Sequence, residues 1–198
     1  EIFNEANGMG EGDNYLGANC SASGSSPQPL WALQRFVNHA AAKIKELDPN
    51  VKVTSSVGNP VYIYDYSNEN LTNKNFSIAS GTLDYYQPHW YYDANNPSSE
   101  GNALNPYNTS ADDFGLDRPI VIGEFAYEYH QDSNTDQGDL AQRIINQGYA
   151  GAWVWDLINL SDAQAQDVIS GANSVVPEIN QNAIDSCIQS QDPTCYNQ

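Results

Sequence analysis

The feature that most constrains the fold is the apolar run of residues 119–125, PIVIGEF, which carries a carboxylate near its end. An almost continuous apolar run of this length is typical of a strand buried on both faces of a parallel sheet. Residues 151–155, GAWVW, have the same character. Between the two runs, residues 136–147 place Leu140, Ile144 and Ile145 on one side of a helix. The order strand, helix, strand predicts a parallel pair joined by a crossover helix.

The same alternation precedes this unit. Residues 30–47 repeat apolar side chains at three- and four-residue steps and predict an amphipathic helix, which ends near Pro49 because proline restricts the residue before it. A β-branched run follows directly, and a mixed segment with a helix around residues 75–79 leads into a strand over residues 83–91. A polar loop is expected over residues 93–113. The sequence therefore predicts an α/β fold with a parallel sheet and strand ends at about Glu5, Ser56, Trp90, Glu124 and Trp155.

Charge and motifs exclude several classes of function. The chain has 7 Lys and Arg against 25 Asp and Glu, a net charge of −18, which repels nucleic acid and anionic membrane surfaces. No apolar run approaches the roughly 18 residues that a membrane span needs. No glycine-rich phosphate motif follows a strand, which argues against a dinucleotide fold. Only 16% of residues are charged, so a surface of amides and hydroxyls is expected, and it suits a carbohydrate partner.

No cofactor and no metal is expected from the sequence. The three histidines, His39, His89 and His130, fall on different expected elements, and no Cys/His spacing suits zinc. The neighbouring Asp112 and Asp113 would allow calcium, but a solvated acidic loop is the more common arrangement.

Sequons and cysteines predict a secreted, extracellular glycoprotein. An Asn-rich sequence also produces Asn-x-Ser/Thr sequons by chance, so each site is a candidate only. Cys187 and Cys195 are close enough to close a small disulfide loop, which leaves Cys20 without a partner in this chain; a buried free thiol is the alternative. The sequons, none with proline in the middle, are at Asn19, Asn70, Asn75, Asn108 and Asn159.

Polar and aromatic side chains gather where the strands are expected to end. In a parallel barrel all strands end at one face, so these residues would meet at one site. Two glutamates there can divide the roles of acid and nucleophile, as glycoside hydrolysis requires, with a separation of about 5–5.5 Å for retention of configuration. Flat aromatic rings stack on the apolar faces of sugars. The residues concerned are Asn4, Glu5, His89, Tyr91, Glu124 and Trp155.

Four of these strand ends carry a family resemblance. They resemble the ends of strands four, six, seven and eight, among the last five strand ends of clan A retaining glycoside hydrolases, most like the family 5 cellulases and mannanases. The motifs are residues 2–5 (IFNE), His89-x-Tyr91, residues 122–125 (IGEF) and residues 151–155 (G-x-x-x-W). The resemblance covers about residues 1–160. It implies a (β/α)8 TIM barrel, of which this chain supplies about strands four to eight.

The resemblance also implies a role for each residue. Glu5 corresponds to the acid/base and Glu124 to the nucleophile, while Asn4 matches the group that holds the sugar 2-hydroxyl. His89 and Tyr91 match the pair on strand six, where the tyrosine orients the nucleophile, and Trp155 matches the sugar platform on strand eight. The implied function is an endo-acting retaining hydrolase of a β-linked polysaccharide, β-1,4-glucan or mannan.

A complete barrel of this type takes about 250 residues. We therefore expect residues 1–198 to be the C-terminal part of one barrel domain, with strands four to eight in residues 1–160 and a helical tail in residues 161–198. The missing N-terminal half would come from the same precursor or from another chain. A half-barrel that dimerises is the alternative.

Several simpler interpretations stay open at this point. Glu124 could be paired with Arg118 or Arg143, and Glu5 could be a solvated loop acid. Tyr92 replaces Tyr91 if the strand register slips by one residue, and Trp153 could be the exposed tryptophan of its strand instead of Trp155. The alternative function is a catalytically inactive barrel that serves as an extracellular structural or carbohydrate-binding glycoprotein.

Overall fold

The computed structural model describes residues 1–6, 29–73, 75, 77–91, 98, 100–126, 143–155, 161 and 166. The chain divides into two compact units, and the first, Glu1–Tyr129 with Ile144–Trp155, contains every strand and labelled helix described below. None of the described helices is both long enough and apolar enough to span a membrane.

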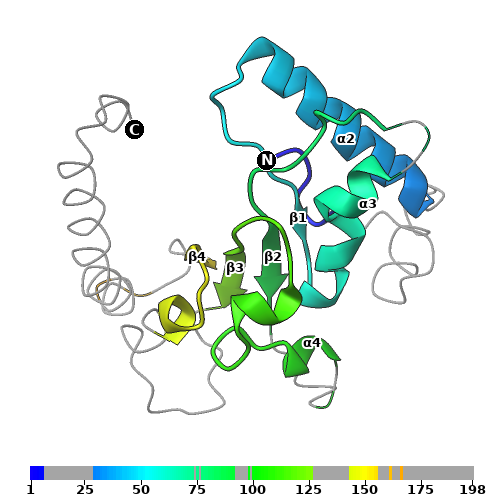
Figure 1. The fold of residues 1–198 in the computed structure, drawn as a ribbon. Coiled ribbons are helices and arrows are strands. Elements are labelled where there is room, and N and C mark those ends of the chain that lie inside the picture. The colour runs from blue at the N-terminus through cyan, green and yellow to red at the C-terminus, as the bar shows by residue number, and fades with distance from the viewer. Residues whose placement is uncertain are drawn as a thin grey trace. The chain divides into compact units, whose positions relative to one another are not determined.

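A sheet of four parallel strands forms the centre of this unit (Figure 1). The strands are β1 (Ser56–Val57), β2 (Gln87–Trp90), β3 (Val121–Ala126) and β4 (Gly151–Trp155), and each is paired with the next one along the chain. All three pairings are parallel, as the alternation of strand and helix signals predicts. The α/β class with a parallel sheet is therefore confirmed. All parallel strands end at the same edge, so the sheet collects the strand ends on one side.

The N-terminal residues lie beside β1, although they form no regular strand. The backbone N–H of Ile2 donates to the carbonyl of Thr54 at 2.8 Å, and the N–H of Ser56 donates to the carbonyl of Phe3 at 2.9 Å. Because the paired residue numbers rise together, this segment runs in the same direction as β1. The segment thereby delivers Glu5 to the same edge of the sheet.

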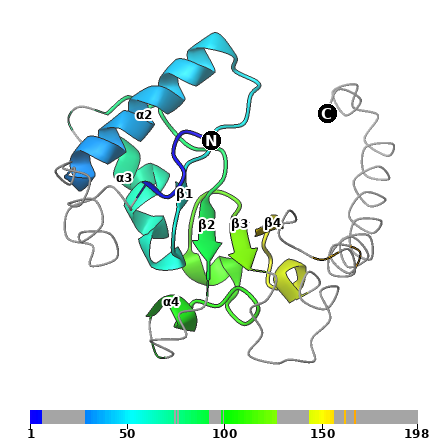
Figure 2. The same ribbon diagram turned by 180° about the vertical axis from the view of Figure 1, so that it is seen from behind.

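The helix α2 (Leu30–Leu47) has the predicted bounds. Its apolar stripe, with Leu33, Val37 and Ala41, is buried, and the chain leaves the helix at Asp48, which is extended as the residue before proline should be. In Figures 1 and 2, α2 lies side by side with α3 (Asn68–Thr72).

Residues 60–80 differ from the sequence prediction. A 3-10 helix, η3 (Pro60–Tyr66), and α3 replace the helix expected around residues 75–79, and the described residues there, 75 and 77–79, are not helical. The caps explain the difference. The Asn59 side chain accepts from the N–H of Val61 and proline occupies the first position of η3, while the Ser67 side chain accepts from the N–H of Asn70.

The loop expected over residues 93–113 also contains short helices. These are α4 (Glu100–Ala103) and η4 (Ala111–Phe114), the second of which begins at a capping box formed by Ser110 and Asp113. The helix expected over residues 136–147 is described only from residue 143, and residues 143–146 are helical.

A buried amide connects α2 to the turn that leads into β2. Asn38 is fully buried, and its Nδ2 donates to the carbonyls of Ile78 and Gly81, both at 2.8 Å. Its Oδ1 accepts from the N–H of Ile78 at 2.7 Å. A Cβ added at Gly81 would lie 2.1 Å from the Asn38 carbonyl oxygen, so only glycine allows this approach. The strand that carries His89 is thus positioned from α2.

We expect Asn38→Ala to lower the free energy of unfolding by about 2–3 kcal/mol, because it removes the three hydrogen bonds that this fully buried amide makes to the backbone of Ile78 and Gly81. Lys43→Ala is the matched control on the same helix, since Lys43 makes only an exposed ion pair with Glu46, and a change within about 0.5 kcal/mol is expected. Urea denaturation measures both. Equal effects of the two substitutions would contradict this role of Asn38.

Candidate active site

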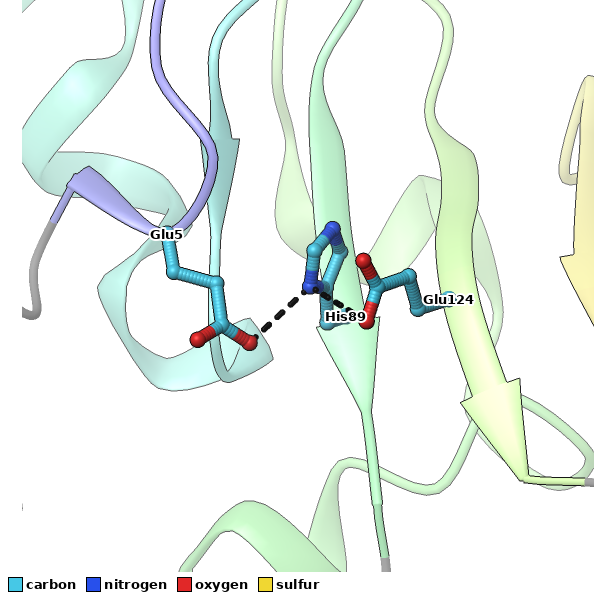
Figure 3. A group of neighbouring side chains, drawn as sticks. All are labelled: Glu5, His89 and Glu124. Atoms are coloured by element: carbon cyan, nitrogen blue, oxygen red, sulfur yellow. Dashed lines mark hydrogen bonds and ion pairs between the residues drawn. The ribbon is translucent and has the colours of Figure 1, made fainter. Parts of the chain in front are cut away.

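Two carboxylates and one imidazole meet at the edge where the strands end (Figure 3). His89 Nδ1 lies 3.0 Å from Glu5 Oε1 and 3.3 Å from Glu124 Oε2. The imidazole nitrogen and one oxygen of each carboxylate all lie within 4.8 Å of one another. The His89 side chain is fully buried, whereas the side chains of Glu5 and Glu124 are 35% and 16% exposed. The two acids therefore share a buried histidine and both reach solvent.

Strand register places His89 beside Glu124. The two residues are partners in the parallel pairing of β2 with β3, so their side chains leave the sheet on the same face. The register of β3 against β4 shifts between Ile122 and Phe125. A Cβ added at Gly123 would lie 2.4 Å from Gln87 Cγ, so a side chain at this position would collide with the buried Gln87. Glycine at position 123 thus lets β3 pair with β2 in the register that places Glu124 beside His89.

The end of β1 positions Glu5. The backbone N–H of Glu5 donates to Ser56 Oγ at 2.9 Å. The φ angle of Glu5 is +52°, in the left-handed region, a conformation that costs a non-glycine residue of order 1–3 kcal/mol. A Cβ at Gly58 would lie 3.1 Å from both Cδ and Oε1 of Glu5, so Gly58 leaves room for the carboxylate. Neighbouring groups therefore hold Glu5 in a strained conformation that faces His89.

Tyr91 provides a second donor to one of the acids. Its hydroxyl donates to Glu124 Oε2 at 2.7 Å. The same oxygen faces His89 Nδ1, so two hydrogen-bond donors converge on one carboxylate oxygen when Nδ1 carries the proton. These contacts fix the orientation of the Glu124 carboxylate. Of the two tyrosines considered from the sequence, Tyr91 is the one placed here, and Tyr92 lies outside the described residues.

His89 has one nitrogen in the site and one outside it. Nδ1 faces two carboxylate acceptors, which indicates that it carries the ring proton. Nε2 is buried and has no hydrogen-bond partner among the residues that the structure describes. The arrangement therefore provides one N–H donor for two acids.

The structure also describes the remaining predicted site residues. Asn4 is exposed and its Oδ1 lies 3.4 Å from Ser56 Oγ. Trp153 and Trp155 are both more than half exposed and are two residues apart on β4, so their side chains lie on the same side of that strand. Trp90, at the end of β2, is 1% exposed and packs edge-on against Tyr107 in the core.

The simpler interpretations of the acids find less support. Arg118 lies 3.7 Å from Asp117, and Glu124 instead contacts His89 and Tyr91. Arg143 belongs to the second unit and is not placed relative to the site. Asp113, one of the two neighbouring acids considered for calcium, accepts the N–H of Ser110 in the cap of η4.

The modification sites are described only in part. Asn75 and Asn108 are exposed, and Asn70 is half-buried with its Nδ2 donating to the Tyr64 carbonyl at 2.7 Å. Glycosylation and the disulfide stay predictions. The residues of these predictions that lie outside the described part of the chain are Asn19, Asn159, Cys20, Cys187 and Cys195.

Sequence reasoning missed the residues that shape the site without entering the chemistry. Ser56 accepts a hydrogen bond from Glu5, and Gly58 leaves room for its carboxylate. Gly123 leaves room for the side chain of Gln87 on the neighbouring strand. The small residues of the stretch SSVG, residues 55–58, at an expected strand end were the available signal.

Comparison with known proteins identifies the relationship. The chain is 35% identical over 134 residues to a mannan endo-1,4-β-mannosidase of Mytilus edulis, a match that covers 64% of this chain and 35% of the relative. The chain is a partial homologue of the endo-1,4-β-mannanases. No protein-family model matches it.

Solved mannanase structures agree with this relationship. The β-mannanase of the blue mussel M. edulis matches with a TM-score of 0.66 and 28% identity over 86% of this chain and 51% of that structure. The β-1,4-mannanase of the sea hare Aplysia kurodai matches with a TM-score of 0.60 and 29% identity over 76% of this chain and 44% of that structure. The chain thus spans about a third to a half of the length of these relatives. The resemblance to these glycoside hydrolases is thus confirmed as partial homology to the β-mannanases.

We expect Gly58→Ala to displace the Glu5 carboxylate by a few tenths of an ångström, because the new Cβ would contact its Cδ and Oε1. The His89 Nδ1 resonance in 15N NMR should then shift, while the free energy of unfolding changes by less than about 1 kcal/mol. Gly151→Ala is the matched control, since its Cβ would meet Val121 at an ordinary 3.8 Å. An unchanged His89 resonance in the Gly58 variant would contradict the assigned role of Gly58.

Proposed function

We propose that this chain supplies both catalytic carboxylates of a retaining β-mannanase that cleaves β-1,4-linked mannan internally. The observation that carries the proposal is the pair Glu5 and Glu124, whose nearest donor oxygens lie within 4.8 Å across His89. Retaining glycosidases hold their two carboxyl groups about 5–5.5 Å apart, whereas inverting enzymes leave about 6.5–9.5 Å for a water molecule. The partial homology to endo-1,4-β-mannanases supports mannan over β-1,4-glucan.

The contacts of the two acids favour a division of roles. Glu124 accepts a hydrogen bond from Tyr91 and faces His89, and these contacts hold its carboxylate in one orientation, which suits a nucleophile. Glu5 has no tyrosine donor among the contacts described, and its side chain is the more exposed of the two. This exposure suits a group that exchanges protons with the leaving sugar and with water.

In the first step, a carboxylate oxygen of Glu124 attacks the anomeric carbon and the glycosidic C–O bond breaks. The proton of Glu5 goes to the leaving oxygen, so the departing sugar is a neutral alcohol. In the second step, Glu5 takes a proton from water, the hydroxyl oxygen bonds to the anomeric carbon and the ester bond to Glu124 breaks. Glu5 is then protonated again and Glu124 ionised.

His89 keeps the two acids in register through both steps. Its Nδ1–H lies within hydrogen-bond distance of Glu5 and close to Glu124, so it can favour whichever carboxylate carries more negative charge. The full burial of the ring holds its orientation. We assign Asn4 to the sugar 2-hydroxyl and Trp155, with Trp153 beside it, to stacking against a sugar ring.

The place of the chain in a whole barrel is part of the same proposal. The four strands and the N-terminal segment beside β1 would be strands four to eight of a (β/α)8 barrel. The remaining strands would come from the rest of the precursor or from another chain, in keeping with the partial coverage of the relatives. We also propose that the protein is extracellular and carries N-glycans, which the exposed Asn75 and Asn108 would permit.

We expect the complete protein containing this chain to hydrolyse β-1,4-mannan, and Glu124→Gln to lower kcat at least about a thousandfold by removing the nucleophile. Reducing-sugar release from mannan, cellulose and xylan measures the activity. Glu69→Gln, an exposed glutamate on α3, is the control and should retain wild-type activity. A folded protein that is inactive on all three polysaccharides would overturn the proposal and favour the inactive, carbohydrate-binding alternative.

A further inference from the structure

We propose that Glu5, His89 and Glu124 also form a binding site for a divalent transition-metal ion, with Zn²⁺ as the probe, and that the bound ion blocks the proposed hydrolase reaction. Among the residues that the structure describes, this is the one group of three or more potential metal-ligating side chains close enough to bind one ion. The inhibition rests on the proposed function, but the binding does not.

The donor set has the chemistry that zinc requires. Two carboxylates and one imidazole are common ligands of Zn²⁺, with bonds of about 2.0–2.2 Å, and three protein ligands leave a fourth position for water. Tetrahedral coordination at such distances places donor atoms about 3.4 Å apart. His89 Nδ1 already lies 3.0 Å from Glu5 Oε1 and 3.3 Å from Glu124 Oε2 (Figure 3). Only the two carboxylate oxygens, at up to 4.8 Å, have to approach each other.

The flexibility needed for that approach is available on one side of the site. The Glu5 side chain is 35% exposed, so its carboxylate can shift on the solvent side while its backbone stays held. Glu124 is fixed by Tyr91, and His89 by its burial. Two fixed ligands and one adjustable ligand permit closure around an ion.

Charge also favours a cation at this position. Binding a metal requires Glu5 to release the proton that it carries as the acid of the proposed reaction. With both carboxylates ionised and His89 neutral, the group has a charge of −2, which one divalent ion balances. The sequence as a whole carries a net charge of −18, so its field adds to the attraction. Without a metal, a single Nδ1–H is the one described bridge between the two acids.

The buried side of the histidine provides a second, independent observation. Metal at Nδ1 requires the Nε2–H tautomer, so the one ring proton moves from Nδ1 to Nε2 and the imidazole stays neutral. Within the described part of the chain, Nε2 is buried without a hydrogen-bond partner, and so is Oε1 of Gln87, two residues earlier on the same face of β2. Histidines that bind metals usually donate their other N–H to such an oxygen. The Nε2–H tautomer would therefore have an unused acceptor on its own side of the strand.

Isothermal titration of the complete, chelator-treated protein with ZnCl₂ tests the site directly. We expect one ion per chain, a higher Tm in its presence, and at least about a tenfold loss of affinity in Glu5→Gln and in Glu124→Gln. Asp112→Asn, an exposed acid on η4, is the control and should bind as the wild type does. Absence of binding, or binding unchanged in both glutamate variants, would overturn the metal site.

Activity separates the metal site from the enzyme proposal. Zinc should inhibit mannan hydrolysis in the concentration range where it binds, and a chelator should restore the activity. An active enzyme that does not bind zinc would refute only the metal site. A protein that binds one zinc through both glutamates but cleaves no polysaccharide would refute only the proposed function.

Discussion

The site depends on one shared interaction, the approach of His89 Nδ1 to Glu5 and Glu124 together. Without a donor between them, two carboxylates within 4.8 Å would repel each other in a partly buried setting. The imidazole supplies that donor and is itself completely buried, so its position is set by the sheet. Strand order, register and the turn before β2 all contribute to where this one nitrogen lies.

Residues around the site adopt energetically unfavourable arrangements that accompany this interaction. Glu5 adopts a left-handed backbone conformation, and His89 Nε2 and Gln87 Oε1 are buried without described partners. A side chain at Gly123 would collide with Gln87, and one at Gly58 would crowd the Glu5 carboxylate. Strain and unpaired polar groups of this kind tend to concentrate at functional sites, because selection for function tolerates them there.

The sequence predicts the sheet and the convergence of the two acids, because both follow from regular patterns. Apolar runs mark parallel strands, the three- and four-residue repeat marks α2, and parallel strands end at one edge. The helices over residues 60–72 were misplaced because local caps at Asn59 and Ser67 outweigh a weak apolar pattern. The small residues of SSVG indicate a close approach at this strand end, but not that Glu5 makes it, because the contact of Gly58 with Glu5 joins residues 53 positions apart, 58 − 5. Exposure of both Trp153 and Trp155 likewise depends on which elements cover β4.

The stereochemistry of hydrolysis tests the proposed chemistry most directly. Proton NMR of a mannooligosaccharide digest, recorded within minutes of mixing with the complete protein, distinguishes the anomer formed first from the one produced later by mutarotation. The short distance between the acids predicts that the β-anomer appears first, because two displacements restore the original configuration. An α-anomer formed first would show a single displacement by water and would contradict the assignment of Glu124 as nucleophile.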